Sequence, residues 1–419
     1  MNRTEIENWI ADDPDPKTAA ELQRLLDAND EAALNKLFNG FLTFGTAGLR
    51  GPIAPGPSGM NRAVVGRTAA AIAQYMKARN LNSVVIGRDA RYGSDDFTRE
   101  SAEILSGAGM QVSVLPRPLP TPVLAHAVKR LNAHVGIMVT ASHNPPMDNG
   151  YKVYLNADVD GIKYQGSQII TPTDKLISAE IDKITSLKSQ PRANNWNDLD
   201  DSVFDDYVKR TALIGKTPGK LKIVYTAMHG VGTETVEAVF READFDAPIL
   251  VTEQAKPDPD FPTVAFPNPE EPGAIDLSIA KAKSVGADLV IANDPDADRC
   301  AAAINDPKHG WRMLRGDELG ILLGDWIARH NPGNYGNSIV SSSGLSKIAK
   351  HYGRNFRETL TGFKYLAQIP NLAFAYEEAI GYSVDSQCVA DKDGVSAAMA
   401  LAQLATELAA NGQTIHDRL

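Results

Sequence analysis

Short apolar runs that end at polar loops recur along most of the chain. Each run is followed at once by a loop rich in Gly, Asp, Ser, Asn or Pro, and then by a stretch with helical spacing. Short runs of this kind, alternating with helical patterns, are typical of buried parallel strands in βα units. The pattern predicts an α/β protein whose functional residues lie in the loops after the strands. The runs are Ser83 to Ile86, Val135 to Val139, Leu221 to Tyr225, Ala287 to Ala292, Ser338 to Val340 and Leu372 to Ala375.

The polar stretches between the runs indicate how the chain divides. Before the first run, Pro16 to Phe38 carries leucines at spacings of three and four, which predicts one or two amphipathic helices that serve packing. Ser186 to Ser202 is almost devoid of apolar residues and is the best linker candidate, and Asn305 to Gly310 is a weaker break. We therefore expect three consecutive α/β domains with mixed or parallel sheets around a central cleft: 1–200, 201–308 and 309–419.

Composition narrows the class of protein. The 419 residues are too many for one core, and 43% hydrophobic content is that of a globular enzyme. The formal net charge of −10 argues against a nucleic-acid surface. No apolar run approaches the roughly 20 residues that cross a bilayer, and the acidic start, broken by prolines, does not have the form of a signal peptide, so we expect a cytoplasmic protein without a membrane partner. Cys300 and Cys388 lie far apart, which excludes a disulfide framework and a CxxC metal site.

The sharpest chemical signal is the set of alternating carboxylates Asp294, Asp296 and Asp298, directly after an apolar run. Pro295 keeps the segment extended, so that alternate side chains share one side. Three oxygen anions on one side suit Mg²⁺, which takes the rest of its shell from water and phosphate. An EF-hand calcium loop is excluded, because its sixth position requires glycine and is Arg299 here, and its twelfth requires glutamate and is Asn305. A solvated acidic loop is the alternative interpretation.

Two further loops carry candidate chemistry. Ser142 follows another apolar run, beside His143 and before two prolines, which favours an exposed and rigidly held nucleophile or phosphoryl carrier. Alone, such a serine is more often a turn residue, and no GxSxG elbow supports a hydrolase. FGTAGLRG, Phe44 to Gly51, has small residues that admit a ligand close to the backbone, and Arg50 suits a phosphate.

Together these motifs define a resemblance. TASHNP, DPDADR and FGTAGLRG, with GDELG, TGFK and EEAIGY, resemble the α-D-phosphohexomutase superfamily, most closely its type 2 phosphoglucomutase and phosphopentomutase branch. AMHGVG at 227–232 and PNPEEPG at 267–273 fit the same branch. The resemblance covers almost the whole chain from Phe41 onward.

The resemblance implies a role for each loop. It implies that Ser142 is carried as phosphoserine and that a phosphate oxygen on it joins the aspartate triplet in holding Mg²⁺. It places Arg50, Lys152 and His143 in the catalytic group. Contacts to a small sugar phosphate are expected from Glu377, Ala379, Thr361, Gly362, Lys364 and Arg299. Many relatives have serine where this chain has Ala379, which we interpret as a property of the branch.

The implied activity is interconversion of glucose 1-phosphate and glucose 6-phosphate through a bisphosphorylated sugar, with glucose 1,6-bisphosphate as activator. Phosphopentomutase and phosphomannomutase activities are alternatives. Lys152 is the preferred general acid or base, through a pKa lowered by nearby cations, and an ordinary exposed ion pair is the other interpretation. Family members normally add a fourth, phosphate-binding domain, and no loop resembling it follows Lys392. A truncated, non-catalytic sugar-phosphate binder therefore remains a further alternative.

Overall fold

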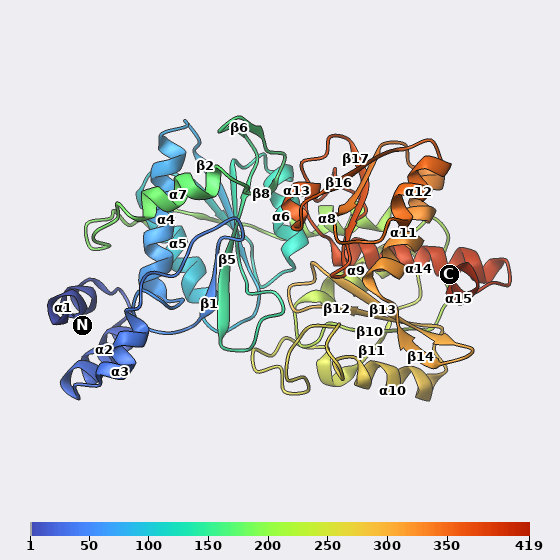
Figure 1. Ribbon diagram of the computed structural model, residues 1–419, viewed down its shortest axis with the longest axis horizontal. Coiled ribbons are helices and arrows are strands. Elements are labelled where there is room, and N and C mark those ends of the chain that lie inside the picture. Colours follow the sequence, from blue (N-terminus) through green and yellow to red (C-terminus); the bar gives the residue numbers. More distant parts are fainter. Residues whose placement is uncertain (1) are drawn as a thin grey trace.

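The computed structural model describes residues 2–419 and shows three lobes, preceded by helices that project from the first lobe (Figure 1). These helices begin at local signals: Asn2, Asp15 and Asp30 each accept a hydrogen bond from a free amide of the first turn. None of the helices in residues 2–419 combines the length and apolar content needed to cross a bilayer. The projecting helices are α1 (Arg3–Asp12), α2 (Pro16–Asp27) and α3 (Glu31–Leu37).

The first domain is built on a mixed sheet of order β1-β5-β4-β2-β3-β9, with β8 added to β5. β2, β3, β4 and β9 pair in parallel, while β5 runs antiparallel to its neighbours β1, β4 and β8. The strands are β1 (Leu49–Pro52), β2 (Ser83–Arg88), β3 (Gln111–Val114), β4 (Val135–Val139), β5 (Asp148–Leu155), β8 (Ser167–Gln168) and β9 (Asn197–Asp198), and β6 (Asp158–Val159) and β7 (Ile162–Lys163) form a small hairpin.

Helices cover both faces of this sheet. Residues of α4, α5 and α7 pack into one apolar core with Val84 and Ile86, whereas α6 packs with Val85 and Tyr154 on the opposite face. In Figure 1 that second face, with α6, is turned toward the other two lobes. The side chains at alternate positions of β5 that face α6 therefore point to the place where the domains meet. The helices are α4 (Arg62–Lys77), α5 (Ser94–Gly107), α6 (Thr121–Arg130) and α7 (Thr173–Ile181).

The second domain has a sheet of order β11-β10-β12-β13-β14. β10 lies parallel between β11 and β12, and β13 and β14 complete the sheet in antiparallel fashion. Its elements are α8 (Ser202–Ala212), β10 (Ile223–Thr226), α9 (Gly232–Glu242), β11 (Ile249–Leu250), the 3₁₀ helix η1 (Thr252–Gln254), α10 (Asp276–Val285), β12 (Leu289–Asn293), β13 (Cys300–Asp306) and β14 (Gly310–Met313).

The third domain has a sheet of order β16-β15-β17-β18, parallel except for β18. Its long helix α14 packs into a core that it shares with the second domain and with α6 of the first. The elements are α11 (Gly316–His330), β15 (Asn334–Ser338), α12 (Gly344–His351), β16 (Asn355–Thr359), α13 (Phe363–Leu366), β17 (Leu372–Glu377), β18 (Gly381–Ser383), α14 (Gly394–Ala410) and α15 (Ile415–Arg418).

The predicted α/β class, with mixed sheets in three consecutive domains, is confirmed. One local prediction differs from the structure. The run expected at Ser338 to Val340 is mostly a turn in which Ile339 and Val340 are exposed, because the strand there is the polar β15. The second sheet includes β14 and extends to Met313. The boundaries expected near Asp200 and Lys308 stay predictions.

Candidate active site

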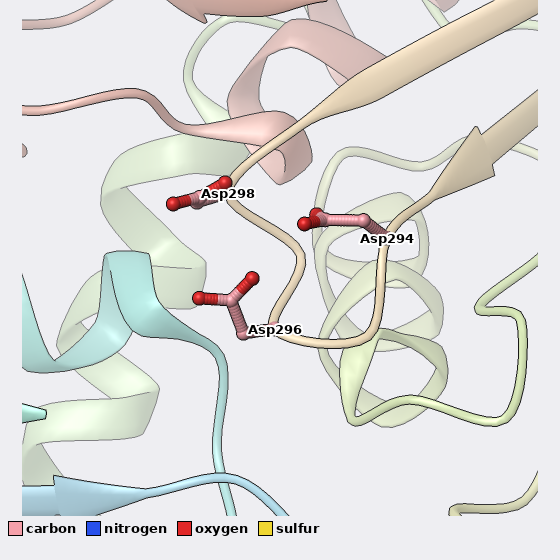
Figure 2. A group of neighbouring side chains, drawn as sticks. All are labelled: Asp294, Asp296 and Asp298. Atoms are coloured by element: carbon pink, nitrogen blue, oxygen red, sulfur yellow. The ribbon is translucent and has the colours of Figure 1, made fainter. Parts of the chain in front are cut away.

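The aspartate triplet lies in the loop between β12 and β13, where the second sheet faces the other domains. Figure 2 shows the three carboxylates turned toward a common space. One oxygen from each carboxylate lies within 4.8 Å of the others, and all three side chains are buried. The N-terminus of α6 approaches the same loop, where Thr121 Oγ1 donates to Asp296 Oδ2 at 2.5 Å. The expected common face of Asp294, Asp296 and Asp298 is therefore present.

The donor set fits a divalent cation. Asp296 Oδ1 and Asp298 Oδ1 are buried and have no hydrogen-bond partner, a costly condition that a bound cation would relieve. Burial and repulsion from Asp296 and Asp298 raise the pKa of Asp294 well above its usual range. Three carboxylate oxygens at this spacing are the ligands that Mg²⁺ prefers. The triplet could hold a metal ion.

Ser142 brings the first domain to this triplet. It follows β4, and its Oγ donates a hydrogen bond to Asp294 Oδ2 at 2.7 Å. Its backbone has a φ of +52°, in the left-handed region that a non-glycine residue occupies only when the surroundings impose it. Its amide donates to Thr140 Oγ1 at 2.9 Å. The hydroxyl is thus held at a defined point beside the acidic loop.

Arg91 binds the backbone of this serine loop. The guanidinium lies 3.4 Å from Asp89 Oδ2 and stacks over the ring of Phe261 in the second domain at 4.9 Å. Its planar guanidinium donates to several carbonyl groups at once, which the single ammonium of a lysine could not reach together. The accepting carbonyl oxygens are those of Ser142 at 2.6 Å, Asn144 at 2.6 Å, Pro145 at 2.8 Å and Asp148 at 3.2 Å.

His143 is neutral in this environment. Burial, with Arg299 and Arg50 as nearby cations, lowers its pKa to about 3. Its Nδ1 lies 3.2 Å from Ser142 Oγ, and its ring packs edge-on against Phe266 of the second domain. His143 therefore contacts the candidate nucleophile directly, and its catalytic role stays a prediction.

Lys152 lies in β5, on the strand face that also carries Tyr154. Its Nζ donates to Asp296 Oδ2 at 2.7 Å and to Asp298 Oδ2 at 2.8 Å. Burial by itself lowers the pKa of Lys152, but these two carboxylates outweigh it and the pKa is raised. The expectation of a lowered pKa was wrong because the nearest charges are anions, and the alternative of an exposed ion pair was wrong because the pair is buried.

The other predicted cations are less directly placed. Arg50 lies in β1, and its Nη1 donates to Asn144 Oδ1 at 3.3 Å, so it contacts the serine loop and not the triplet. Arg299 follows the triplet, and its backbone forms an antiparallel bridge with Gly381 of the third domain. Its Nε is buried without a hydrogen-bond partner.

The third domain contributes loops at the ends of its strands. Glu377 ends β17, and its Oε1 accepts a hydrogen bond from the amide of Gly362 at 2.7 Å. Burial raises the pKa of Glu377, against the opposing effect of Lys392. Lys364 donates to Thr46 Oγ1 in the glycine-rich loop of the first domain. Among residues 2–419, no side-chain hydrogen bond or ion pair joins Thr361 or Ala379 to the triplet or to Ser142.

Lys392 is a site residue that the motifs missed. Its Nζ lies 3.2 Å from Asp298 Oδ2, so Asp298 has one lysine from the first domain and one from the third. Only the polar stretch Asp391 to Asp393, directly before α14, signalled this loop in the sequence. Nothing in that stretch indicates which domain its side chains reach.

Comparison with known families agrees with this arrangement. Three models match in succession: phosphoglucomutase/phosphomannomutase alpha/beta/alpha domain I at residues 42–188, domain II at 204–309 and domain III at 315–419. The chain therefore belongs to the phosphoglucomutase/phosphomannomutase family of the α-D-phosphohexomutase superfamily, as its motifs predicted. It is an enzyme of the phosphohexomutase type.

Individual relatives cover most of the chain. A probable phosphomannomutase of Haemophilus influenzae is 47% identical over 366 residues, which are 86% of this chain and 74% of the relative. A phosphopentomutase of Mus musculus is 37% identical, over 99% of this chain and 72% of the relative. The phosphoribomutase of Saccharomyces cerevisiae is 36% identical, over 95% of this chain and 70% of the relative.

Solved structures show the same fold at lower identity. A putative phosphomannomutase from Thermus thermophilus superposes with a TM-score of 0.75 at 24% identity, covering 90% of this chain and 82% of that one. A phosphoglucomutase/phosphomannomutase family protein from Burkholderia thailandensis superposes with a TM-score of 0.72 at 22% identity. The match covers 86% of this chain and 76% of that one.

Proposed function

We propose that this enzyme interconverts glucose 1-phosphate and glucose 6-phosphate through a phosphoserine at Ser142 and a bisphosphorylated sugar. One observation carries the proposal: the Ser142 hydroxyl lies 2.7 Å from Asp294, at the edge of a buried carboxylate triplet. A phosphoryl carrier needs a fixed oxygen next to a site that neutralises phosphate charge. This arrangement provides both.

In the proposed transfer, one bond to phosphorus is exchanged for another within the site. The bond between phosphorus and Ser142 Oγ breaks while a bond forms between phosphorus and a hydroxyl oxygen of the sugar phosphate. The hydroxyl proton ends on the serine oxygen. The bisphosphate then turns around and returns its other phosphoryl group to Ser142, which restores the phosphoserine and leaves the isomeric product.

The remaining residues bind and neutralise charge. Asp294, Asp296 and Asp298, with a phosphate oxygen on Ser142, would hold Mg²⁺, which when bound supplies positive charge to the phosphoryl oxygens. Lys152 and Arg50 contribute fixed cations on the first-domain side. In the third domain, Glu377 is proposed to bind sugar hydroxyls, with Thr361, Gly362, Lys364, Ala379 and Arg299 as further contacts. Glucose 1,6-bisphosphate is the proposed activator because it can phosphorylate Ser142 directly.

A pentose phosphate is the second candidate substrate. Relatives that cover nearly all of this chain at 36–37% identity are named phosphopentomutase and phosphoribomutase. Mannose 1-phosphate is a third, because the 47% identical relative is named a probable phosphomannomutase. The sugar is selected by contacts from the third domain, so kcat/KM across these substrates discriminates among them.

The test combines intact-protein mass with turnover of glucose, ribose, deoxyribose and mannose 1-phosphates, each with Mg²⁺ and a trace of the matching bisphosphate. The wild type and a Ser346→Ala control, in α12 of the third domain, should carry one phosphate and turn over at least one sugar. Ser142→Ala should carry no phosphate and lose activity by at least about a thousandfold. Equal turnover by Ser142→Ala would overturn the proposal, and binding without turnover by the wild type would favour a non-catalytic sugar-phosphate binder.

A further inference from the structure

Residues Asp385–Asp393, which make up most of the segment between β18 and α14, contact both of the other domains. We name these residues the clasp segment. Six of its nine residues contact side chains of the first or second domain. Asp385 Oδ2 accepts from Arg210 at 2.7 Å, the Ser386 carbonyl from Lys129 at 2.8 Å, Asp391 Oδ2 from Tyr154 at 2.8 Å and Asp393 Oδ1 from Tyr207 at 2.8 Å, while Cys388 Sγ lies 3.2 Å from His126 Nδ1 and Lys392 Nζ 3.2 Å from Asp298 Oδ2.

Asp391 is the buried anion of this segment that reaches the first sheet. Its Oδ2 accepts from Tyr154 at 2.8 Å and from Gln168 Nε2 at 2.6 Å, on two residues paired across β5 and β8. Its Oδ1 accepts from the amide of Lys392 at 2.8 Å and lies 3.9 Å from the Lys392 ammonium. The carboxylate is 1% exposed, so these contacts are made without competition from water.

The contacts of Asp391 close a ring around Asp298. Tyr154 is two residues after Lys152, so both side chains leave β5 on the same face. Lys152 and Lys392 approach the same atom, Asp298 Oδ2, at 2.8 Å and 3.2 Å. Asp391 joins the two arms of this ring, because it binds Tyr154 on one side and the backbone of Lys392 on the other.

We propose that Asp391 is a positioning residue for the phosphoryl transfer, and this inference rests on the proposed function. Through Tyr154 and Gln168 it fixes the separation between Lys152 and Lys392 on either side of Asp298. A lysine side chain has four rotatable bonds, and one ion pair does not fix it. When Asp298 engages another cation, Asp391 is the anion that keeps Lys392 in place. Small displacements of charged groups at a reacting centre cost large factors in rate.

The kinetic test uses Asp391→Asn, Tyr154→Phe and their combination, with Asp385→Asn as the matched control. Asp385 belongs to the same segment but pairs with Arg210 at the surface. We expect each of the first two variants to lower kcat by about ten- to a hundredfold, with KM changed less than about threefold. The double variant should resemble the single ones, since both remove one coupled arrangement. Asp391→Glu should recover part of kcat, whereas Asp385→Asn should match the wild type.

A second readout does not depend on turnover. Reductive methylation, followed by peptide mass mapping, reports how well each lysine is held and shielded. In Asp391→Asn and in Tyr154→Phe the labelling rate of Lys392 should rise severalfold over the wild type, while exposed Lys347 stays constant. A Lys392 that remains protected, or a kcat loss that only follows the unfolded fraction, overturns the positioning role. If the wild type turns over no sugar, the proposed function fails, and the labelling result still decides whether Asp391 holds Lys392.

Discussion

Ser142 Oγ and Asp294 Oδ2 share a hydrogen bond of 2.7 Å although 152 residues separate them in the chain. The serine lies in the loop after β4 of the first sheet, and the aspartate directly follows β12 of the second. Two loops at strand ends thus meet at one point, which unites a candidate phosphoryl carrier with a candidate cation site.

Asp296→Asn should weaken Mg²⁺ binding by at least about tenfold, because it removes one of the three buried anions that face the common space. Isothermal titration with MgCl₂ measures this directly. Asp288→Asn is the control, since Asp288 is exposed at the opposite end of β12. Equal Mg²⁺ affinity in the wild type and Asp296→Asn would show that the cation binds elsewhere.

Arg91→Lys should lower the free energy of unfolding by about 3 kcal/mol and also reduce activity. A lysine leaves several carbonyls of the serine loop without a donor, and it binds Asp89 less completely. Urea denaturation at pH 7.5 gives the stability change. Arg88→Lys is a matched control because Arg88 pairs with the exposed Asp95, and it should differ little from the wild type. A similar loss in both variants would contradict the special role of Arg91.

Lys364→Met should raise KM for the sugar phosphate by about tenfold or more, because it removes a half-buried cation that links the third domain to Thr46 in the glycine-rich loop. Burial lowers the pKa of Lys364. Steady-state kinetics with the sugar phosphate that the wild type turns over best supply the measurement. Lys350→Met, on exposed α12, should leave KM unchanged, and a normal KM in Lys364→Met would remove this lysine from the proposed contacts.

His126 should make the fold sensitive to acid. Burial lowers its pKa below the ordinary value of 6.5, although Asp206 opposes this. Its contribution to stability is therefore complete above pH 6.5 and is lost as the pH falls further, because the unfolded chain takes up the proton more readily. Arg130 and Cys388, which also face this group, do not supply a second anion.

Urea denaturation at pH 7.5 and pH 5.5 tests this dependence. The wild type should lose more stability over that interval than His126→Gln, which cannot be protonated. His351→Gln removes an exposed histidine and should keep the wild-type slope. Identical slopes for the wild type and His126→Gln would disprove the effect.

The sequence predicted those parts of the fold and site that depend on local pattern. Apolar runs located β2, β4, β10, β12 and β17 to within a few residues, and the alternation of aspartates located the candidate metal loop. β15 was misplaced because its buried Asn337 and Ser338 are polar. Asn337 Nδ2 donates to the nearby Ser342 carbonyl, and Ser338 Oγ donates to Glu378, which only the tertiary structure brings near.

Residues whose role depends on distant segments could not be placed in the same way. Arg91 and Lys392 stand in short polar stretches that give no sign of their partners in other loops. The prediction of a lowered pKa for Lys152 was wrong for the same reason, because this pKa depends on which charged groups lie across the domain boundary.

The grip of Arg91 on the serine loop has a consequence for how a substrate must behave. Because four carbonyls of the serine loop bind one guanidinium, the loop is held in place and Ser142 cannot move from one end of a sugar to the other. Both half-reactions must then take place at the same point, so the bisphosphorylated sugar has to reorient between them. The surrounding surface must release it far enough to pivot while still preventing its escape.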